Sequence, residues 1–149
     1  MERLTKSKAL VGSLKADEDI VAETTIQAGQ GIQSAAVAVT ATADGLTTGI
    51  IPAGASYVTV TSGNANHIVA LPAPVIGNVI WINVGANGFE LRSSAPATIA
   101  INGGAEADAE SAIAANSTVL AICISLTAWK AIFLDADSDV AKVAAAAAA

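Results

Sequence analysis

The feature that most constrains the fold of this chain is a series of short apolar segments separated by turn-forming residues. Between residues 35 and 134, stretches of four to nine residues rich in Val, Ile, Ala and Thr are broken by Gly, Pro, Asn or Asp. This spacing is typical of an all-β sandwich or barrel, and no long stretch shows the 3.6-residue period of a helix. The predicted strands are residues 35–43, 46–51, 56–61, 67–71, 79–84, 89–92, 97–101, 118–126 and 129–134.

Alternation within these segments predicts which side chains face the core. Val58 and Val60 share one face of residues 56–61, and Ile80, Ile82 and Val84 share one face of residues 79–84. Asn87-Gly88 lies between residues 79–84 and 89–92, and this pair is a strong signal for a type I′ β-hairpin. We therefore expect a small antiparallel sandwich or barrel.

Residues 118–126 differ from the other segments because both of their faces are apolar. One face carries Leu120, Ile122, Ile124 and Leu126, and the other carries Val119, Ala121 and Cys123. This pattern is typical of a central strand or of a strand at a subunit interface. The residues that we predict to contact a partner here are Val119, Ala121, Ile122 and Ile124.

Charge is distributed unevenly along the chain. The first fifteen residues carry a net charge of about +3, whereas residues 16–149 carry -9, which gives the overall charge of -6. We predict an extended N-terminal arm (1–34), a β-domain (35–140) and an Ala-rich tail (141–149). The basic residues of the arm are predicted partner contacts: Arg3, Lys6, Lys8 and Lys15.

Composition excludes several classes of function. The chain has 53% hydrophobic, 3% aromatic and 13% charged residues, and its acidic balance disfavours nucleic-acid binding. The most apolar stretch, residues 119–134, is shorter than the roughly 20 residues of a membrane span and contains Lys130. We expect no signal peptide, and hence synthesis in a cytoplasm. A core built from Ala, Val and Ile is thin for 149 residues, which predicts a homo-oligomer.

No set of residues predicts catalysis. His67 and Cys123 are the only histidine and cysteine, and both fall in predicted strands without a neighbouring motif. Asp135, Asp137 and Asp139 have the spacing that opens a calcium loop, but Val140 replaces the Gly that the turn of an EF-hand needs. A loose calcium site there stays open as an alternative to a solvated acidic segment. Glu106, Asp108 and Glu110 also alternate. We predict no enzyme, no cofactor and no resident metal.

A set of turn sequences carries a resemblance to a known group of proteins. These are Ile51-Pro52-Ala53-Gly54-Ala55, Leu71-Pro72-Ala73-Pro74, Gly85-Ala86-Asn87-Gly88-Phe89-Glu90-Leu91-Arg92, Ile101-Asn102-Gly103-Gly104 and Trp129-Lys130-Ala131. Through them, residues 46–134 resemble small structural proteins of tailed bacteriophage particles, including marine and cyanobacterial phages. No binding motif of that group maps onto this sequence.

The resemblance implies a head decoration or cement protein. Such proteins commonly form trimers on the capsid surface, and an N-terminal arm often adds to a sheet of the major capsid protein. The expected partners are therefore the major capsid protein and further copies of this chain, on a virion assembled in the host cytoplasm. The alternative is a fibre- or tail-associated receptor-binding β-domain. In that role, exposed Trp residues and Asn-rich loops would stack on and hydrogen-bond a surface glycan. Tyr57, Trp81, Phe89 and Trp129 are either such a stacking platform or residues of the core.

Overall fold

In the computed structural model of the protein, the regular secondary structure is entirely β-strand over the residues that the structure describes, 36–45, 47–134, 140–145 and 147–148. The chain divides into two units, Met1–Gln33 and Ser34–Ala149, and all the described residues belong to the second. The predicted arm and its four basic residues lie outside the described residues. Within the described part, no helix is long and apolar enough to cross a membrane.

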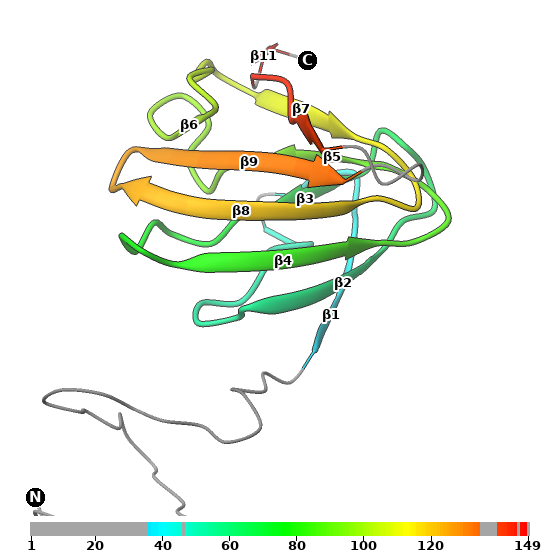
Figure 1. The fold of residues 1–149 in the computed structure, drawn as a ribbon. Coiled ribbons are helices and arrows are strands. Elements are labelled where there is room, and N and C mark those ends of the chain that lie inside the picture. Colours follow the sequence, from blue (N-terminus) through cyan, green and yellow to red (C-terminus); the bar gives the residue numbers. More distant parts are fainter. Residues whose placement is uncertain (1–35, 46, 135–139, 146, 149) are drawn as a thin grey trace, which may run out of the picture. The chain divides into compact units, whose positions relative to one another are not determined.

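The strands form two sheets, which are seen in Figure 1. One sheet has seven strands in the order β1-β2-β4-β8-β9-β10, with β6 also paired to β9, and the other has the order β11-β7-β5-β3. The predicted all-β class is confirmed, while a closed barrel or a two-layer sandwich stays a prediction. The strands are β1 (Val37–Thr40), β2 (Tyr57–Thr61), β3 (Ile68–Ala70), β4 (Val79–Val84), β5 (Phe89–Arg92), β6 (Ala100–Ile101), β7 (Ala109–Ile113), β8 (Thr118–Ser125), β9 (Ala128–Leu134), β10 (Val140–Lys142) and β11 (Ala147–Ala148).

Both sheets are mixed, which corrects the prediction of an antiparallel fold. The pairs β1–β2, β2–β4, β3–β5 and β6–β9 are parallel. The chain crosses between the two sheets as it passes from β2 to β3, then β4, then β5. We call one passage through both sheets a circuit, so that β2 and β3 form one circuit and β4 and β5 form the next. The strands of the second circuit lie beside those of the first, as in the stacked repeats of a solenoid. β8 and β9, joined by a tight turn, form a long antiparallel hairpin.

The predicted hairpin at Asn87-Gly88 is wrong, because β4 and β5 belong to different sheets. Gly88 is buried, and a Cβ atom there would clash with the carbonyl oxygen of Ile113. The Asn87 side chain instead donates a hydrogen bond from Nδ2 to the Ser62 carbonyl, at 2.8 Å. Gly88 therefore allows two backbone segments to come close, and Asn87 forms a hydrogen bond between successive circuits. The pair does not form a two-residue turn.

Side chains from both sheets form one buried cluster. Val58 and Val60 of β2 are 0% and 3% exposed, and Ile80, Ile82 and Val84 of β4 are also buried, so the predicted alternation is confirmed. The four-stranded sheet contributes Phe89 and Leu91 from β5 and Ala109 and Ile113 from β7. Trp129 of β9 is the largest fully buried side chain. Val119, Ala121 and Cys123 of β8 and Ala131 of β9 belong to the same core, and the alternate positions of these strands point away from it.

The described residues of the predicted tail are part of the β-unit. β10 extends the seven-stranded sheet beside β9, and β11 extends the four-stranded sheet beside β7. Val143 is fully buried, and its carbonyl accepts a hydrogen bond from Asn102 Nδ2 at 2.7 Å. The boundary predicted after residue 140 therefore does not separate a tail from the domain. The physical reason is that the edges of β9 and β7 offer backbone donors and acceptors that this segment satisfies.

Candidate functional site

The outward surface of β2, β4, β8 and β9 is apolar apart from Lys130 and one polar row, made of Thr59, Asn83 and Thr118. Tyr57, Trp81, Leu120 and Ile132 are register neighbours and form one row across β2, β4, β8 and β9. Adjacent rows add further apolar side chains. We call this surface the apolar face; it consists of Tyr57, Val79, Trp81, Leu120, Ile122, Ile124, Ile132 and Leu134.

The apolar face is accessible and nearly free of charge. Trp81 is 43% exposed and Ile124 is 49% exposed, although both residues lie within regular strands. Among the outward positions of β2, β4, β8 and β9, Lys130 alone is charged. Exposed apolar patches of this kind mark interaction surfaces in soluble proteins.

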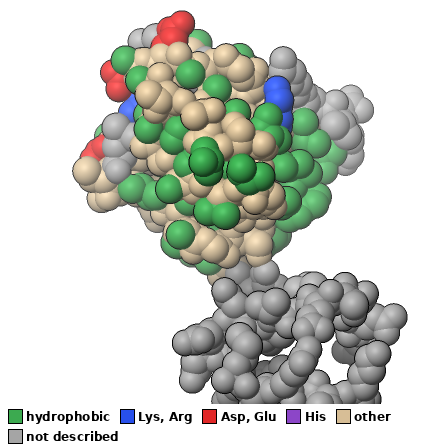
Figure 2. All heavy atoms as spheres, turned by 90° about the vertical axis from the view of Figure 1, so that its left-hand side faces the viewer, with side chains coloured by type: hydrophobic (Ala, Val, Ile, Leu, Met, Phe, Trp, Pro, Cys, Tyr) green, Lys and Arg blue, Asp and Glu red, His purple; other side chains and the backbone are tan. Residues whose placement is uncertain are grey.

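More exposed apolar residues lie toward one end of β4 and β8. Val75 and Ile76 are each 63% exposed and Leu126 is 65% exposed. The Gly77 amide donates to the Cys123 carbonyl at 2.9 Å, which joins the loop before β4 to the end of β8. Figure 2 shows the side of the unit at the left of Figure 1, with hydrophobic side chains at its centre and right and acidic side chains at the upper left.

The structure separates the residues predicted to contact a partner. Ile122 and Ile124 of β8 lie on the apolar face, whereas Val119 and Ala121 are fully buried in the core. Those two side chains have no surface with which to contact a partner. Residues 118–126 are apolar on both faces because β8 is a central strand: one face packs in the core and the other belongs to the apolar face. Sequence alone does not say which of two apolar faces is the outer one.

The outward surface of the four-stranded sheet carries charged residues and a hollow of about 690 Å³. Glu90 and Arg92 of β5 and Glu110 and Ala112 of β7 are among its lining residues. The register places Arg92 opposite Glu110 and Glu90 opposite Ala112. We call this feature the charged hollow; its lining is completed by Ala43, Asn66, Ile68, Asp108 and Ala147.

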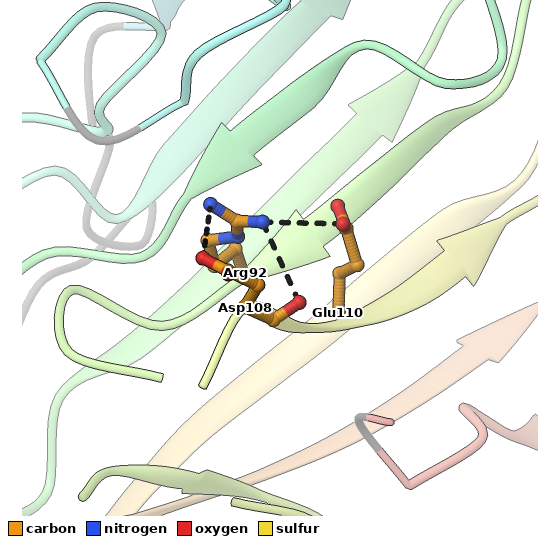
Figure 3. A network of polar contacts seen from close by, with 3 residues as sticks. All are labelled: Arg92, Asp108 and Glu110. Atoms are coloured by element: carbon orange, nitrogen blue, oxygen red, sulfur yellow. Dashed lines mark hydrogen bonds and ion pairs between the residues drawn. The ribbon is translucent and has the colours of Figure 1, made fainter. Parts of the chain in front are cut away.

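Arg92 is the centre of the polar network in the hollow, which is drawn in Figure 3. Its Nη2 atom lies 3.1 Å from Glu110 Oε1 and 3.4 Å from the Asp108 carbonyl oxygen, and its Nη1 lies 3.9 Å from Asp108 Oδ1. The Arg92 and Glu110 side chains are 7% and 10% exposed, whereas that of Asp108 is 73% exposed. The Arg92–Glu110 pair is therefore the buried part of this network.

Two buried polar atoms of the pair have no hydrogen-bond partner, namely Arg92 Nε and Glu110 Oε2. Glu90 stands diagonally across the strand pair from Glu110. Desolvation by burial raises the pKa of the Glu90 carboxyl, and the negative charge of Glu110 raises it further. The hollow thus contains more carboxylate charge than Arg92 neutralises.

The sequence indicated the two groups of charged residues that line the hollow, but it did not indicate that they lie beside each other. Glu90 and Arg92 have the i, i+2 spacing of residues that share a strand face, and so do Asp108 and Glu110. This spacing was the available signal. Arg92 and Glu110 are 18 positions apart, so only the tertiary structure brings them together.

The other residues weighed for chemistry are not assembled into a catalytic or metal site in the described part of the chain. Cys123 is a buried free thiol in β8, and His67 precedes β3 with its Nδ1 buried and without a partner. In the described ranges, no group of three or more His, Cys, Asp or Glu side chains is arranged to hold a metal ion. Asp135, Asp137 and Asp139 lie outside the described residues.

No protein-family model, no curated protein and no solved structure matches this chain. A function for the protein therefore has to be argued from its two outward surfaces. One surface is suited to apolar contact over a sheet, and the other is suited to a polar ligand in a hollow.

Proposed function

We propose that the protein is a structural virion protein, a capsid decoration protein that binds the outside of a phage head and stabilises its shell. The observation that carries the proposal is the apolar face, because an exposed sheet surface with a single lysine is suited to permanent association. The sequence resemblance of residues 46–134 to structural proteins of tailed phages is the reason for proposing a phage head as the assembly. In this role the protein acts mechanically, by tying neighbouring subunits together.

The exposure of the apolar face supports self-association. Most residues of the apolar face are more than a third exposed, as are Val75, Ile76 and Leu126, and an exposed apolar patch of this kind marks a protein interaction surface. A second copy of the chain would bury a matching area. We therefore propose that copies of the β-unit associate through the apolar face, as a trimer if the assembly follows the resembling proteins.

The major capsid protein is the second proposed partner. In this proposal the basic residues Arg3, Lys6, Lys8 and Lys15 meet acidic patches on the shell, and the N-terminal segment adds a strand to a capsid sheet. Deleting the first 20 or so residues tests this contact. Binding of the truncated protein to empty heads with unchanged affinity would contradict it.

The position of the protein on particles tests the proposed function. Immunogold labelling, or reconstruction of particles that contain the protein, should show many copies dispersed over the head in clusters. Labelling at the tail alone would contradict the decoration role and favour a receptor-binding role. Absence of the protein from purified particles would contradict both.

A specific observation favours glycan binding as the second candidate function. Tyr57 and Trp81 are register neighbours on β2 and β4, and they are 39% and 43% exposed. Two adjacent exposed aromatic rings can stack on the apolar faces of sugar rings. A glycan array probed with the protein and with Trp81→Ala distinguishes the two functions, since specific signals lost in the variant would favour the receptor-binding role.

A further inference from the structure

We infer that the charged hollow of the four-stranded sheet binds a cationic side chain, lysine or arginine, presented by a partner protein. This inference goes beyond the proposed virion role and does not depend on it. It rests on the charges, the buried carboxylate oxygen without a partner and the lining of the hollow.

The balance of charge in the hollow favours a cation. Three carboxylates, those of Glu90, Asp108 and Glu110, line it together with a single guanidinium, that of Arg92. An anionic ligand would face this excess of negative charge. A neutral ligand would leave Glu90 and Glu110 repelling each other, whereas a cation between them would attract both.

Hydrogen-bonding capacity in the hollow is also unused. The Glu110 side chain is nine-tenths buried and is held by Arg92 through Oε1, while its Oε2 accepts no hydrogen bond. Figure 3 shows Glu110 presenting one carboxylate oxygen to Arg92. Because Oε2 is covered from solvent in the free protein, an ammonium or guanidinium group would satisfy it as a donor once the Glu110 side chain turns toward the hollow.

The remaining groups favour a peptide-borne cation over a metal ion or a free amine. The described residues hold no cluster of three or more potential metal ligands. Ile68, Ala112 and Ala147 provide apolar contacts for the methylene stem of a lysine or arginine.

Titration of small probes into the intact protein, followed by NMR, tests the inference. The probes are Nα-acetyl-lysine methylamide, its arginine counterpart and the uncharged norleucine counterpart. We expect saturable shifts at Glu90 and Ala112 with the cationic probes and none with norleucine. The lysine and arginine arms show which donor group is preferred. Equal shifts with norleucine, or no saturable shift with either cation, would overturn the inference.

Matched variants locate the binding and separate it from general attraction to an acidic protein. Glu90→Gln removes a carboxylate inside the hollow and should weaken binding about fivefold, whereas Glu106→Gln removes an exposed carboxylate outside it and should leave affinity within about twofold. Ala112→Leu, at an exposed position, should block the hollow without changing its charge. Equal weakening by Glu90→Gln and Glu106→Gln, or unchanged binding in both hollow variants, would show that the cation binds elsewhere.

Discussion

The outward surfaces of the two sheets are opposites in chemistry although the same strand geometry builds both. Across β2, β4, β8 and β9 the outward row is Tyr57, Trp81, Leu120 and Ile132. Across β3, β5, β7 and β11 the corresponding row is Ala70, Arg92, Glu110 and Ala147, in which Ala70 and Arg92 are buried. In each case the register turns residues that are far apart in sequence into one continuous row.

The two surfaces contribute free energy at different stages, the charged one when the chain folds and the apolar one when a partner binds. An exposed apolar row gains free energy only when a partner covers it, because burial removes its surface from water. A buried ion pair forms when the chain folds, and removing one of its two members lowers the stability of the folded protein. Substitutions on the charged surface should therefore act on folding, and those on the apolar surface on association.

Loss of the buried guanidinium should have the largest effect. Arg92→Met leaves Glu110 buried without its counter-charge, so we expect the free energy of unfolding to fall by about 3 kcal/mol. Chemical denaturation measures the change. Lys130→Met, which removes an exposed charge from the apolar face, is the control and should change stability by less than about 0.5 kcal/mol. If both variants lost the same free energy of unfolding, the two surfaces would not differ in their contribution to folding.

A charge placed on the apolar face should have the next largest effect, on association alone. Trp81→Lys should weaken self-association by about 2 kcal/mol, because it puts a cation at the centre of the proposed interface. Sedimentation velocity measures the shift toward a monomer. The same change at the exposed loop position Ala65 is the control and should leave the oligomer intact. A wild-type protein that is monomeric at micromolar concentration would contradict the proposed interface.

The bond between successive circuits should contribute less. Asn87→Ala removes the donor to the Ser62 carbonyl and should lower stability by about 1 kcal/mol. Asn87→Asp keeps the shape of the side chain but also lacks the donor, so thermal unfolding should show a loss in both variants. Full stability in Asn87→Asp would mean that the hydrogen bond is not what stabilises this corner.

The smallest effect should be a pH-dependent one at Glu90. Because its pKa is raised in the folded protein, its contribution favours folding below the ordinary glutamate pKa and is lost as the pH rises through the folded pKa. Glu90→Gln should therefore have a higher Tm than the wild type at pH 7, and the difference should close near about pH 4. A difference that is constant across this range would exclude titration of Glu90 as its cause.

Local pattern predicted those features that depend only on the period of a strand. The all-β class and the burial of Val58 and Val60 required no knowledge of strand partners. The parallel pairing and the role of Asn87-Gly88 did require it. A short turn sequence has the same composition whether it closes a hairpin or carries the chain from one sheet to the other. Gly88 is needed here because the Ile113 backbone comes close, which no local pattern indicates.

By itself, the sequence determined that alternating short strands would bury one face and that residues 118–126 would be apolar on both. Tertiary structure decided that Val119 and Ala121 face the core, that Ile122 and Ile124 face outward, and that Arg92 meets Glu110. The physical reason is that alternation is a property of one strand, whereas surfaces and ion pairs are made by register between strands. Register is set by the packing of the whole core, and so the proposed partner surfaces emerge only in the folded unit.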